Sequence, residues 1–260
     1  MKILITGHKG FIGQNMIEAL SEHQLSFFEW DDDLPRVDSF DWVIHFGAIS
    51  STTETDVEKV MRQNYDFSCW LVKECNRYGV NLQYSSSASV YGLNKDFKED
   101  AAKSPASPYA WSKYLFDRHV EENKNKWNII VQGFRYFNVY GPHEDHKGDQ
   151  ASPYHKFTQQ AITTGKIKIF EDSDTYLRDF VPVETVVNIH KAFFDVDESG
   201  IWNVGTGVPK SFKTVAEEVA AKYPATIEYI PMPDNIKKQY QAYTCANLTN
   251  LNETLYAKTI

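Results

Sequence analysis

The chain has 260 residues, 42% of them hydrophobic and 24% charged, so it can bury a substantial core and is expected to form one large domain or slightly more. Its formal net charge of −8 argues against a protein that binds the phosphate backbone of nucleic acids, because such binding needs clustered lysine and arginine. The three cysteines, Cys69, Cys75 and Cys245, form no Cys-x-x-Cys pair, so we expect neither a disulfide framework nor a bound metal.

The N-terminal stretch "MKILITG" is an apolar segment with no basic and apolar leader before it. No run in the sequence approaches the roughly 18 apolar residues of a membrane span. We therefore expect a cytoplasmic protein that does not cross a membrane.

Short segments rich in β-branched and aromatic residues alternate with longer segments of helical period, which is typical of βαβ units around a parallel sheet. The predicted strands are residues 2–6, 25–30, 42–46, 80–85 and 128–135. The predicted helices are residues 11–22, 55–78, 107–123, 151–164, 183–196 and 211–222. After about residue 150 the pieces become shorter, as in "KIKIFE" and "GIWNVG". We expect an α/β fold with a doubly wound parallel sheet over residues 1–150 and a smaller, interleaved substrate-binding lobe over residues 151–260.

The stretch "ITGHKGFIG" places Gly7, Gly10 and Gly13 between a predicted strand and a predicted helix. Glycines at this spacing allow a tight turn and a close approach of the backbone to a pyrophosphate, and the helix N-terminus offers N–H groups to the anion. This pattern predicts a Rossmann-like dinucleotide-binding domain, although three glycines alone also fit a plain strand-turn-helix.

The second predicted strand ends in an acidic cluster, "EWDDD", about 18 residues beyond the last of these glycines. An acidic residue at this place binds the ribose hydroxyls of a dinucleotide, with Asp31 as the first candidate and Asp32 as the second. The cluster favours NAD because it would repel a 2′-phosphate. Arg36 could instead pair with that phosphate, which leaves NADP open, and a solvated acidic turn is the alternative to any binding role.

Tyr109 and Lys113, in "YAWSK", lie four residues apart at the start of a predicted helix, so their side chains share one face. A phenol with an ordinary pKa of about 10 acts as an acid or base near neutrality only if a cation lowers that pKa, and Lys113 can supply the charge. The run "SSSASVYG" ends a predicted strand and offers Ser87 to hold a substrate oxygen. A tyrosine and a lysine at this spacing also occur by chance on helix surfaces, but the three parts in this order favour a catalytic site.

The glycine turn, the serine and the Tyr-x-x-x-Lys pair occur in this order in the extended short-chain dehydrogenase/reductase superfamily, which the sequence resembles. It is more similar still to the ADP-L-glycero-D-manno-heptose 6-epimerases. The stretches that carry this similarity span nearly the whole chain and are "HFGAISSTTE" (45–54), "SSASVYG" (86–92), "GFRYFNVYGPHEDHKG" (133–148), "IFEDSDTYLRDFV" (169–181), "NVGTG" (203–207) and "YQAYTCANLTNL" (240–251).

The resemblance implies a nucleotide-sugar epimerase, above all an ADP-glycero-manno-heptose 6-epimerase, that works as a homo-oligomer in the synthesis of a lipopolysaccharide-type surface glycan. It implies removal of hydride from the sugar to bound NAD or NADP, one per subunit and retained through turnover, and return of hydride to the opposite face of a keto intermediate. Two faces need two proton-handling groups. The resemblance assigns one role to Tyr109, assisted by Lys113 and Ser87, and the other to Lys147 in "HKG".

The resemblance also implies two sets of binding residues. The cofactor set is Gly7, Gly10, Phe11, Ile12, Gly13, Asp31, Asp32, Phe46, Gly47, Ala48, Ser50, Asn64, Lys113 and Val139. The substrate set is Ser51, Ser87, Asn138, Asp149, Lys156, Phe170, Glu171, Asp172, Ser173, Arg178 and Tyr240. Taken without the resemblance, Arg178 is more typical of a structural salt bridge and Tyr240 of a packed aromatic, and Thr53 or Thr55 could serve as a helix N-cap.

The sequence departs from this family in three places. Only about ten residues separate Asp31 from "WVIHF", where the family has a third strand and a helix, so the adenine wall is shortened. Asp149 and Lys156 stand where the family has a serine and a histidine, which makes a changed sugar conceivable. The sequence ends at "LYAKTI", before the closing helix that we expect in the family. Next to Lys147, residues 143–145 are interpreted as a solvated charged turn.

Two other functions remain open. One is a different NAD(P)-dependent nucleotide-sugar epimerase or reductase; a dehydratase is disfavoured because "SSASVYG" lacks the Asp-Glu pair expected beside its active hydroxyl. The other is a non-catalytic dinucleotide-binding protein, which would have no need for Tyr109 and Lys147 together.

Overall fold

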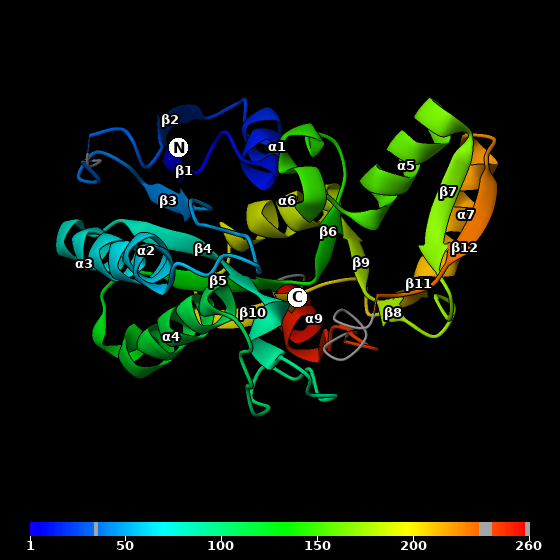
Figure 1. The fold of residues 1–260 in the computed structure, drawn as a ribbon. Coiled ribbons are helices and arrows are strands. Elements are labelled where there is room, and N and C mark those ends of the chain that lie inside the picture. Colours follow the sequence, from blue (N-terminus) through cyan, green and yellow to red (C-terminus); the bar gives the residue numbers. More distant parts are fainter. Residues whose placement is uncertain (34–35, 234–240, 258–260) are drawn as a thin grey trace.

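A computed structural model of the protein describes residues 1–33, 36–233 and 241–257. Its centre is a six-stranded parallel sheet in the order β10-β5-β4-β3-β1-β2 (Figure 1). The strands are β1 (Lys2–Thr6), β2 (Gln24–Phe28), β3 (Trp42–His45), β4 (Asn81–Ser87), β5 (Val131–Tyr136) and β10 (Gly200–Val204). The predicted α/β fold with a Rossmann-like doubly wound sheet is confirmed, and the five predicted strands appear with ends shifted by a few residues.

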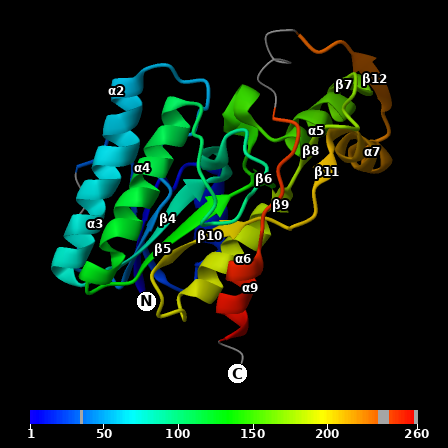
Figure 2. The same cartoon turned by 90° about the horizontal axis from the view of Figure 1, so that it is seen from below.

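Helices cover both faces of the sheet. The helices are α1 (Phe11–Ala19), α2 (Val57–Val60), a π-helical turn η1 (Met61–Asp66), α3 (Phe67–Tyr78), α4 (Pro108–Asn123) and α6 (Val183–Phe193). Helices α3 and α4 lie side by side on one face, and α1 and α6 pack together on the other (Figures 1 and 2). Because α2, η1 and α3 form one continuous helical segment, the prediction of a helix over residues 55–78 is close, but its N-cap is Asp56, which accepts a hydrogen bond from the Lys59 N–H, rather than Thr53 or Thr55.

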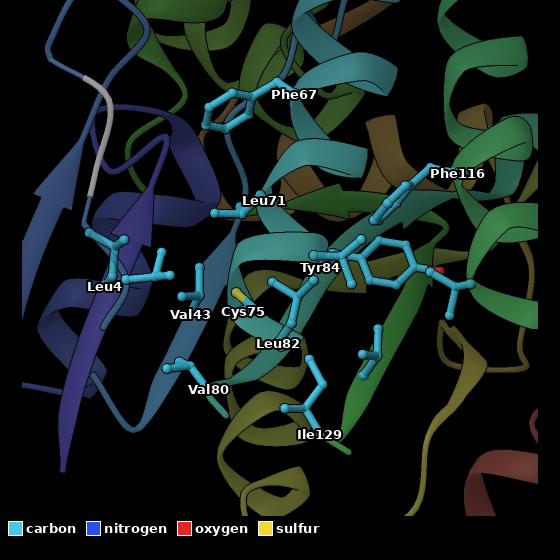
Figure 3. Close-up of a cluster of buried hydrophobic side chains, with 14 of the residues drawn as sticks. Leu4, Val43, Phe67, Leu71, Cys75, Val80, Leu82, Tyr84, Phe116 and Ile129 are labelled. Carbon is cyan, nitrogen blue, oxygen red and sulfur yellow. The ribbon is translucent and has the colours of Figure 1, made fainter. Parts of the chain in front are cut away.

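The largest cluster of buried side chains lies between the sheet and the α3/α4 layer (Figure 3). Leu82 and Tyr84 of β4 meet Leu71 of α3 and Phe116 of α4, and each of these four is at most 2% exposed. Alternation of side chains along β4 explains this contact, because residues two apart point to the same face of a strand. A second buried cluster, between α1, α6 and the other face, includes Met16 and Val187.

A smaller lobe lies at one end of the sheet (Figure 1). It contains α5 (Pro153–Thr164), the parallel pair β7 (Lys166–Phe170) and β12 (Thr226–Ile230), and α7 (Phe212–Lys222). Two short pairs connect it to the sheet: β6 (Asn138–Tyr140) with β9 (Phe180–Pro182), and β8 (Leu177–Arg178) with β11 (Lys210–Ser211). Between these elements the chain returns to the large sheet through α6 and β10.

Three local differences from the predicted elements stand out, and the first two have an identifiable cause. β2 ends at Phe28 because the Glu29 N–H donates to Asp32 Oδ2 at 2.7 Å and starts a turn. β5 begins only at Val131 because the Ile130 N–H donates to the Asn81 side chain at 2.9 Å. A helix that was not predicted, α9 (Thr249–Tyr256), contacts β10 near the C-terminus.

The shortened connection after Asp31 is visible in the fold. Residues 31–33 and 36–41 contain no strand or helix, and β2 is therefore the edge of the sheet. In the usual doubly wound order a third strand would lie next to β2. No helix in the described part of the chain combines the length and apolar character that crossing a membrane requires.

Candidate active site

The glycine turn between β1 and α1 is shaped for close backbone approach. Gly7 has φ +72°, and a Cβ atom there would come within 2.5 Å of the Gly47 nitrogen. A Cβ on Gly13 would collide with the Gly7 carbonyl oxygen. Gly10 is the N-cap of α1 and has no side chain, so no side-chain hydrogen bond caps the N–H groups of the first turn. This is the arrangement that binds a pyrophosphate at a helix N-terminus.

The turn opens into a cavity of about 400 Å³, which we call the main cavity. Its lining combines glycine backbone, small polar side chains, two phenols and two lysine ammonium groups. The lining residues are Gly7, Gly10, Phe11, Ile12, Gly13, Glu29, Phe46, Gly47, Ala48, Ser50, Ser51, Ser85, Ser86, Tyr109, Lys113, Tyr136, His146, Lys147 and Gln150. A volume in this range is typical of a small-molecule site.

A second cavity of about 140 Å³ adjoins it and shares Gly7, Glu29, Gly47 and Ala48 with it. We call it the side cavity. Its other lining residues are Thr6, Phe28, Trp30, Ile49, Gln63 and Phe67. The two cavities together form a trough across the carboxyl ends of β1, β2 and β3, which is where open α/β sheets bind their ligands.

Glu29, which directly follows β2, is the acidic residue on the walls of both cavities. Its carboxylate accepts a hydrogen bond from the Lys9 N–H at 2.8 Å and lies 3.1 Å from His8 Nδ1. The structure places Asp31 and Asp32 on the exposed turn instead, and neither lines either cavity. Glu29 was not predicted because the end of β2 lies two residues earlier than the sequence pattern indicates.

Tyr109 and Lys113 stand on successive turns of α4 and both line the main cavity. Helix α4 begins here because Pro108 occupies its first turn and Ser107 caps it by accepting from the Ala110 N–H. The Lys113 ammonium donates to the Ser85 carbonyl at 2.8 Å and lies 6.0 Å from the centre of the Tyr109 ring. Ser87 is not among the lining residues but forms a hydrogen bond with Tyr109.

Burial controls the pKa of both groups. It raises the pKa of Tyr109 above its ordinary value, and the hydrogen bond with Ser87 only partly opposes this. Burial lowers the pKa of Lys113 to about 8, opposed by the Asp117 carboxylate. We expected Lys113 to lower the pKa of Tyr109, but in the protein without ligand the pKa of Tyr109 is raised. The Lys113 ammonium instead donates to the Ser85 carbonyl.

Lys147 reaches the main cavity from the loop after β6, within the 3₁₀ segment η4 (Asp145–Gln150). Its ammonium lies 4.8 Å from the centre of the Phe11 ring and 3.8 Å from Glu144 Oε2. Burial lowers the pKa of Lys147, and the Glu144 carboxylate opposes this. The loop thus holds a second titratable cation in the cavity that contains Tyr109.

Glu144 corrects our interpretation of residues 143–145 as a solvated turn. It is 1% exposed, and its carboxylate accepts hydrogen bonds from the Gly141 N–H, the Ser152 N–H and the Ser152 hydroxyl. It therefore joins both ends of the loop that carries Lys147. A buried carboxylate is stable only with such partners.

Comparison with protein families decides the membership of this chain. Residues 29–205 match the model of the NAD dependent epimerase/dehydratase family. The chain belongs to this family. Its membership agrees with the trough and with the prediction of an enzyme that uses a nicotinamide dinucleotide.

Solved structures with the same fold include several epimerases. ADP-L-glycero-D-manno-heptose-6-epimerase from Helicobacter pylori is 26% identical, with a TM-score of 0.86 over 98% of this chain and 90% of that chain. UDP-N-acetylglucosamine 4-epimerase from Methanobrevibacter ruminantium is 22% identical, with a TM-score of 0.88 over 98% and 91%. UDP-glucose 4-epimerase from Thermotoga maritima is 24% identical, with a TM-score of 0.83 over 98% and 93%.

Two residues that we predicted to bind the cofactor do not line either cavity of this epimerase/dehydratase family member. Asn64 is 2% exposed and holds the loop after β3 by bonding both the N–H and the carbonyl of Ile49. Val139 packs against the buried cluster between β5, β10 and α6. Neither lines the main or the side cavity.

The predicted substrate residues are more scattered, and among those that the structure describes only Ser51 lines the main cavity. Asn138 is exposed on β6, and the Lys156 ammonium donates to the Asp149 carbonyl at 2.7 Å. The stretch from Phe170 to Ser173 forms the turn after β7, in which Asp172 has φ +62°. Arg178 is 8% exposed and lies over the Phe212 ring. Tyr240 lies outside the described residues.

Sequence reasoning missed several lining residues besides Glu29. These are Ser85, Ser86, Tyr136, His146 and Gln150. His146 precedes Lys147 within the matched stretch 133–148, which could have indicated it, whereas Gln150 lies two residues beyond that stretch. Tyr136 also lies within the stretch, but an aromatic residue in a buried strand is ordinarily part of the core. Within residues 1–33, 36–233 and 241–257, no cluster of three or more His, Cys, Asp or Glu side chains suits a metal ion.

Proposed function

We propose that this protein is an NAD-dependent nucleotide-sugar epimerase and that ADP-glycero-manno-heptose is its substrate, epimerised at carbon 6. The observation that carries the proposal is the shared lining of the main cavity, where Tyr109, Lys113 and Lys147 meet the glycine turn. A non-catalytic dinucleotide-binding protein would have no use for two separate titratable groups beside the same site. In this proposal residues 1–150 mainly hold the cofactor and residues 151–260 contribute the sugar-nucleotide side.

The trough fits a dinucleotide. Gly7 and Gly13 leave room that a Cβ atom would fill, and the N-terminus of α1 suits the pyrophosphate. Glu29 lies where a ribose hydroxyl pair would bind, and its negative charge disfavours a 2′-phosphate. We therefore favour NAD over NADP, with Glu29 in the role that the sequence first assigned to Asp31. When bound, the nicotinamide supplies reversible acceptance of hydride from a sugar carbon.

Tyr109 is the proposed proton-handling group on one face of the sugar. In its phenolate form Tyr109 takes the proton of the sugar hydroxyl as hydride leaves that carbon for the nicotinamide, and the resulting phenol donates the proton to the carbonyl oxygen when the same epimer is formed again. Ser87, which forms a hydrogen bond with Tyr109, is the proposed second group that holds the oxygen of the reacting sugar hydroxyl. Lys113, with its pKa lowered to about 8, positions the ribose next to the nicotinamide and supplies positive charge near the phenol.

Lys147 is the proposed group on the opposite face. The keto sugar must turn over between the two transfers, and a second acid or base is then needed where Tyr109 cannot reach. Burial lowers the pKa of Lys147, which brings this amine closer to the range in which it can exchange a proton. Support for the heptose comes from the stretches of the sequence that resemble the heptose epimerases and from the 26% identity with the Helicobacter pylori enzyme.

The proposal is tested by incubating the purified protein with each ADP-heptose epimer and following the carbon-6 signals by NMR, without added cofactor. Interconversion without net redox change is the expected result. UDP-glucose and UDP-N-acetylglucosamine are run in parallel, because epimerisation of either in place of ADP-heptose would identify a different nucleotide sugar. No conversion of any of these by protein that contains NAD would refute the epimerase assignment for these substrates.

A further inference from the structure

The edge strand β2 lies next to the side cavity, where the adenine of a dinucleotide would need a wall. β2 has no third strand beside it among the described residues, yet the side cavity next to it is enclosed well enough to have a volume of about 140 Å³. A cavity of roughly 150 Å³ suffices for one aromatic ring. The side cavity is close to that size and continues into the main cavity at Glu29, so the two together leave room for the base of a nucleotide, provided that something replaces the missing wall.

Trp30 occupies that position. It follows Glu29 at the end of β2, lines the side cavity and is 41% exposed. Its ring meets the Phe67 ring edge-on, with centres 5.6 Å apart and planes at 78°. Phe67 is in turn stacked on Phe28, with centres 5.4 Å apart and planes at 15°. These three rings, from β2, the turn after it and α3, give the side cavity an aromatic wall.

The rest of the cavity adds polar groups suited to a purine. Gln63, on the π-helical turn η1, brings an amide to the lining. An amide has both donor and acceptor atoms, and so does the edge of adenine. The cavity also meets the main cavity at Glu29, where we place the ribose, so a base attached to that ribose would lie within reach of Trp30 and Gln63.

We propose that Trp30 is the outer wall of an adenine pocket and substitutes, as a single side chain, for the strand that the sheet lacks at β2. This inference rests on the proposed use of NAD. Stacking of a base on an aromatic side chain explains why a large indole stays partly exposed beside a cavity, because the bound base would cover it.

Titration of nucleotide-free protein with AMP, NAD and nicotinamide mononucleotide tests the proposal, with calorimetry for affinity and tryptophan fluorescence as the second readout. AMP and NAD should quench the fluorescence. Trp30→Ala should weaken AMP and NAD binding about ten-fold and abolish the quenching, while leaving the affinity for nicotinamide mononucleotide unchanged. Trp30→Phe should give intermediate affinity, because a ring remains.

Trp111→Ala is the matched control. Trp111 is 46% exposed and lies on α4 outside both cavities, so this variant should bind AMP and NAD as the unaltered protein does. Undiminished AMP binding by Trp30→Ala, in a variant whose unfolding temperature is unchanged, would overturn the role of Trp30 and leave the epimerase proposal intact. Failure of the unaltered protein to bind either AMP or NAD would instead refute both.

Discussion

The Glu144 carboxylate lies 3.8 Å from the Lys147 ammonium while its two oxygens also accept hydrogen bonds from both ends of the loop, at Gly141 and Ser152. One buried side chain therefore fixes the shape of the loop and biases the protonation of the lysine that the loop carries. These two effects can be separated by experiment, because one concerns folding and the other concerns the pH dependence of catalysis.

Glu144→Gln should move the alkaline limb of the kcat/KM profile to lower pH. The carboxylate raises the pKa of Lys147 against the effect of burial, so its neutralisation leaves burial unopposed and the lysine loses its proton at lower pH. The amide has one acceptor oxygen in place of two, and we also expect a loss of roughly 1–3 kcal/mol in unfolding free energy. A variant that is less stable but keeps the original pH profile would contradict the electrostatic role.

Lys147→Met and Tyr109→Phe should fail in opposite ways. If each group serves one face of the keto sugar, each variant should still oxidise one of the two epimers but not the other. Oxidation of that epimer reduces the bound NAD, which is seen as the absorbance band of NADH. Epimerisation should fall by about 10²–10⁴-fold in both. Lys98→Met, on an exposed lysine outside the cavities, is the control and should epimerise normally. Normal epimerisation by Lys147→Met would remove Lys147 from the mechanism.

Lys113→Met should stabilise the protein while it inactivates it. The unfolded chain holds the lysine proton up to pH 10.5, whereas the folded protein releases it at about 8, so the charged lysine costs folding free energy below pH 8. The pKa shift of Lys113 corresponds to up to about 3 kcal/mol of unfolding free energy at pH 7, which the variant should gain. This gain should shrink between pH 8 and pH 10.5 and be absent above that range. Urea unfolding at pH 7 and pH 10.5 measures it. Equal stability of both proteins at pH 7 would show that the ammonium is not penalised by burial.

Asp117→Asn should destabilise the protein strongly. Asp117 accepts from Arg135 Nε at 2.8 Å, and both side chains are 1% exposed. Loss of one partner of a buried ion pair leaves an uncompensated charge and costs roughly 3–5 kcal/mol. The adjacent Arg118, paired with Glu122 on the surface, offers the control: Arg118→Ala should change the unfolding free energy by less than about 1 kcal/mol. Similar losses in both variants would mean that the buried pair has no special role.

The sheet and the common placement of Tyr109 and Lys113 were predictable because each depends on local pattern. Runs such as "WVIHF" are typical of buried parallel strands, and the helical spacing of Tyr109 and Lys113 fixes their common face wherever α4 lies. The position of Glu29 was not predictable, because it depends on a turn closed by two hydrogen bonds with Asp32, one to the Asp32 carboxylate and one from the Asp32 N–H. The burial of Glu144 was missed for a related reason: a carboxylate in a charged loop is ordinarily solvated, and its partners at Gly141 and Ser152 are set by the folded loop.

The π-helical turn Met61–Asp66 has a consequence for how this site can change. Each residue advances an α-helix by about 100°, so a wide turn amounts to one inserted residue that rotates everything before it relative to α3. Neighbouring residues of this turn serve two places: Gln63 lines the side cavity, and Asn64 holds Ile49. Deletion of a single residue here should restore a regular helix and displace both side chains at once, so an insertion or deletion at this turn should disturb the side cavity and the Ile49 loop together, which a single substitution would not do.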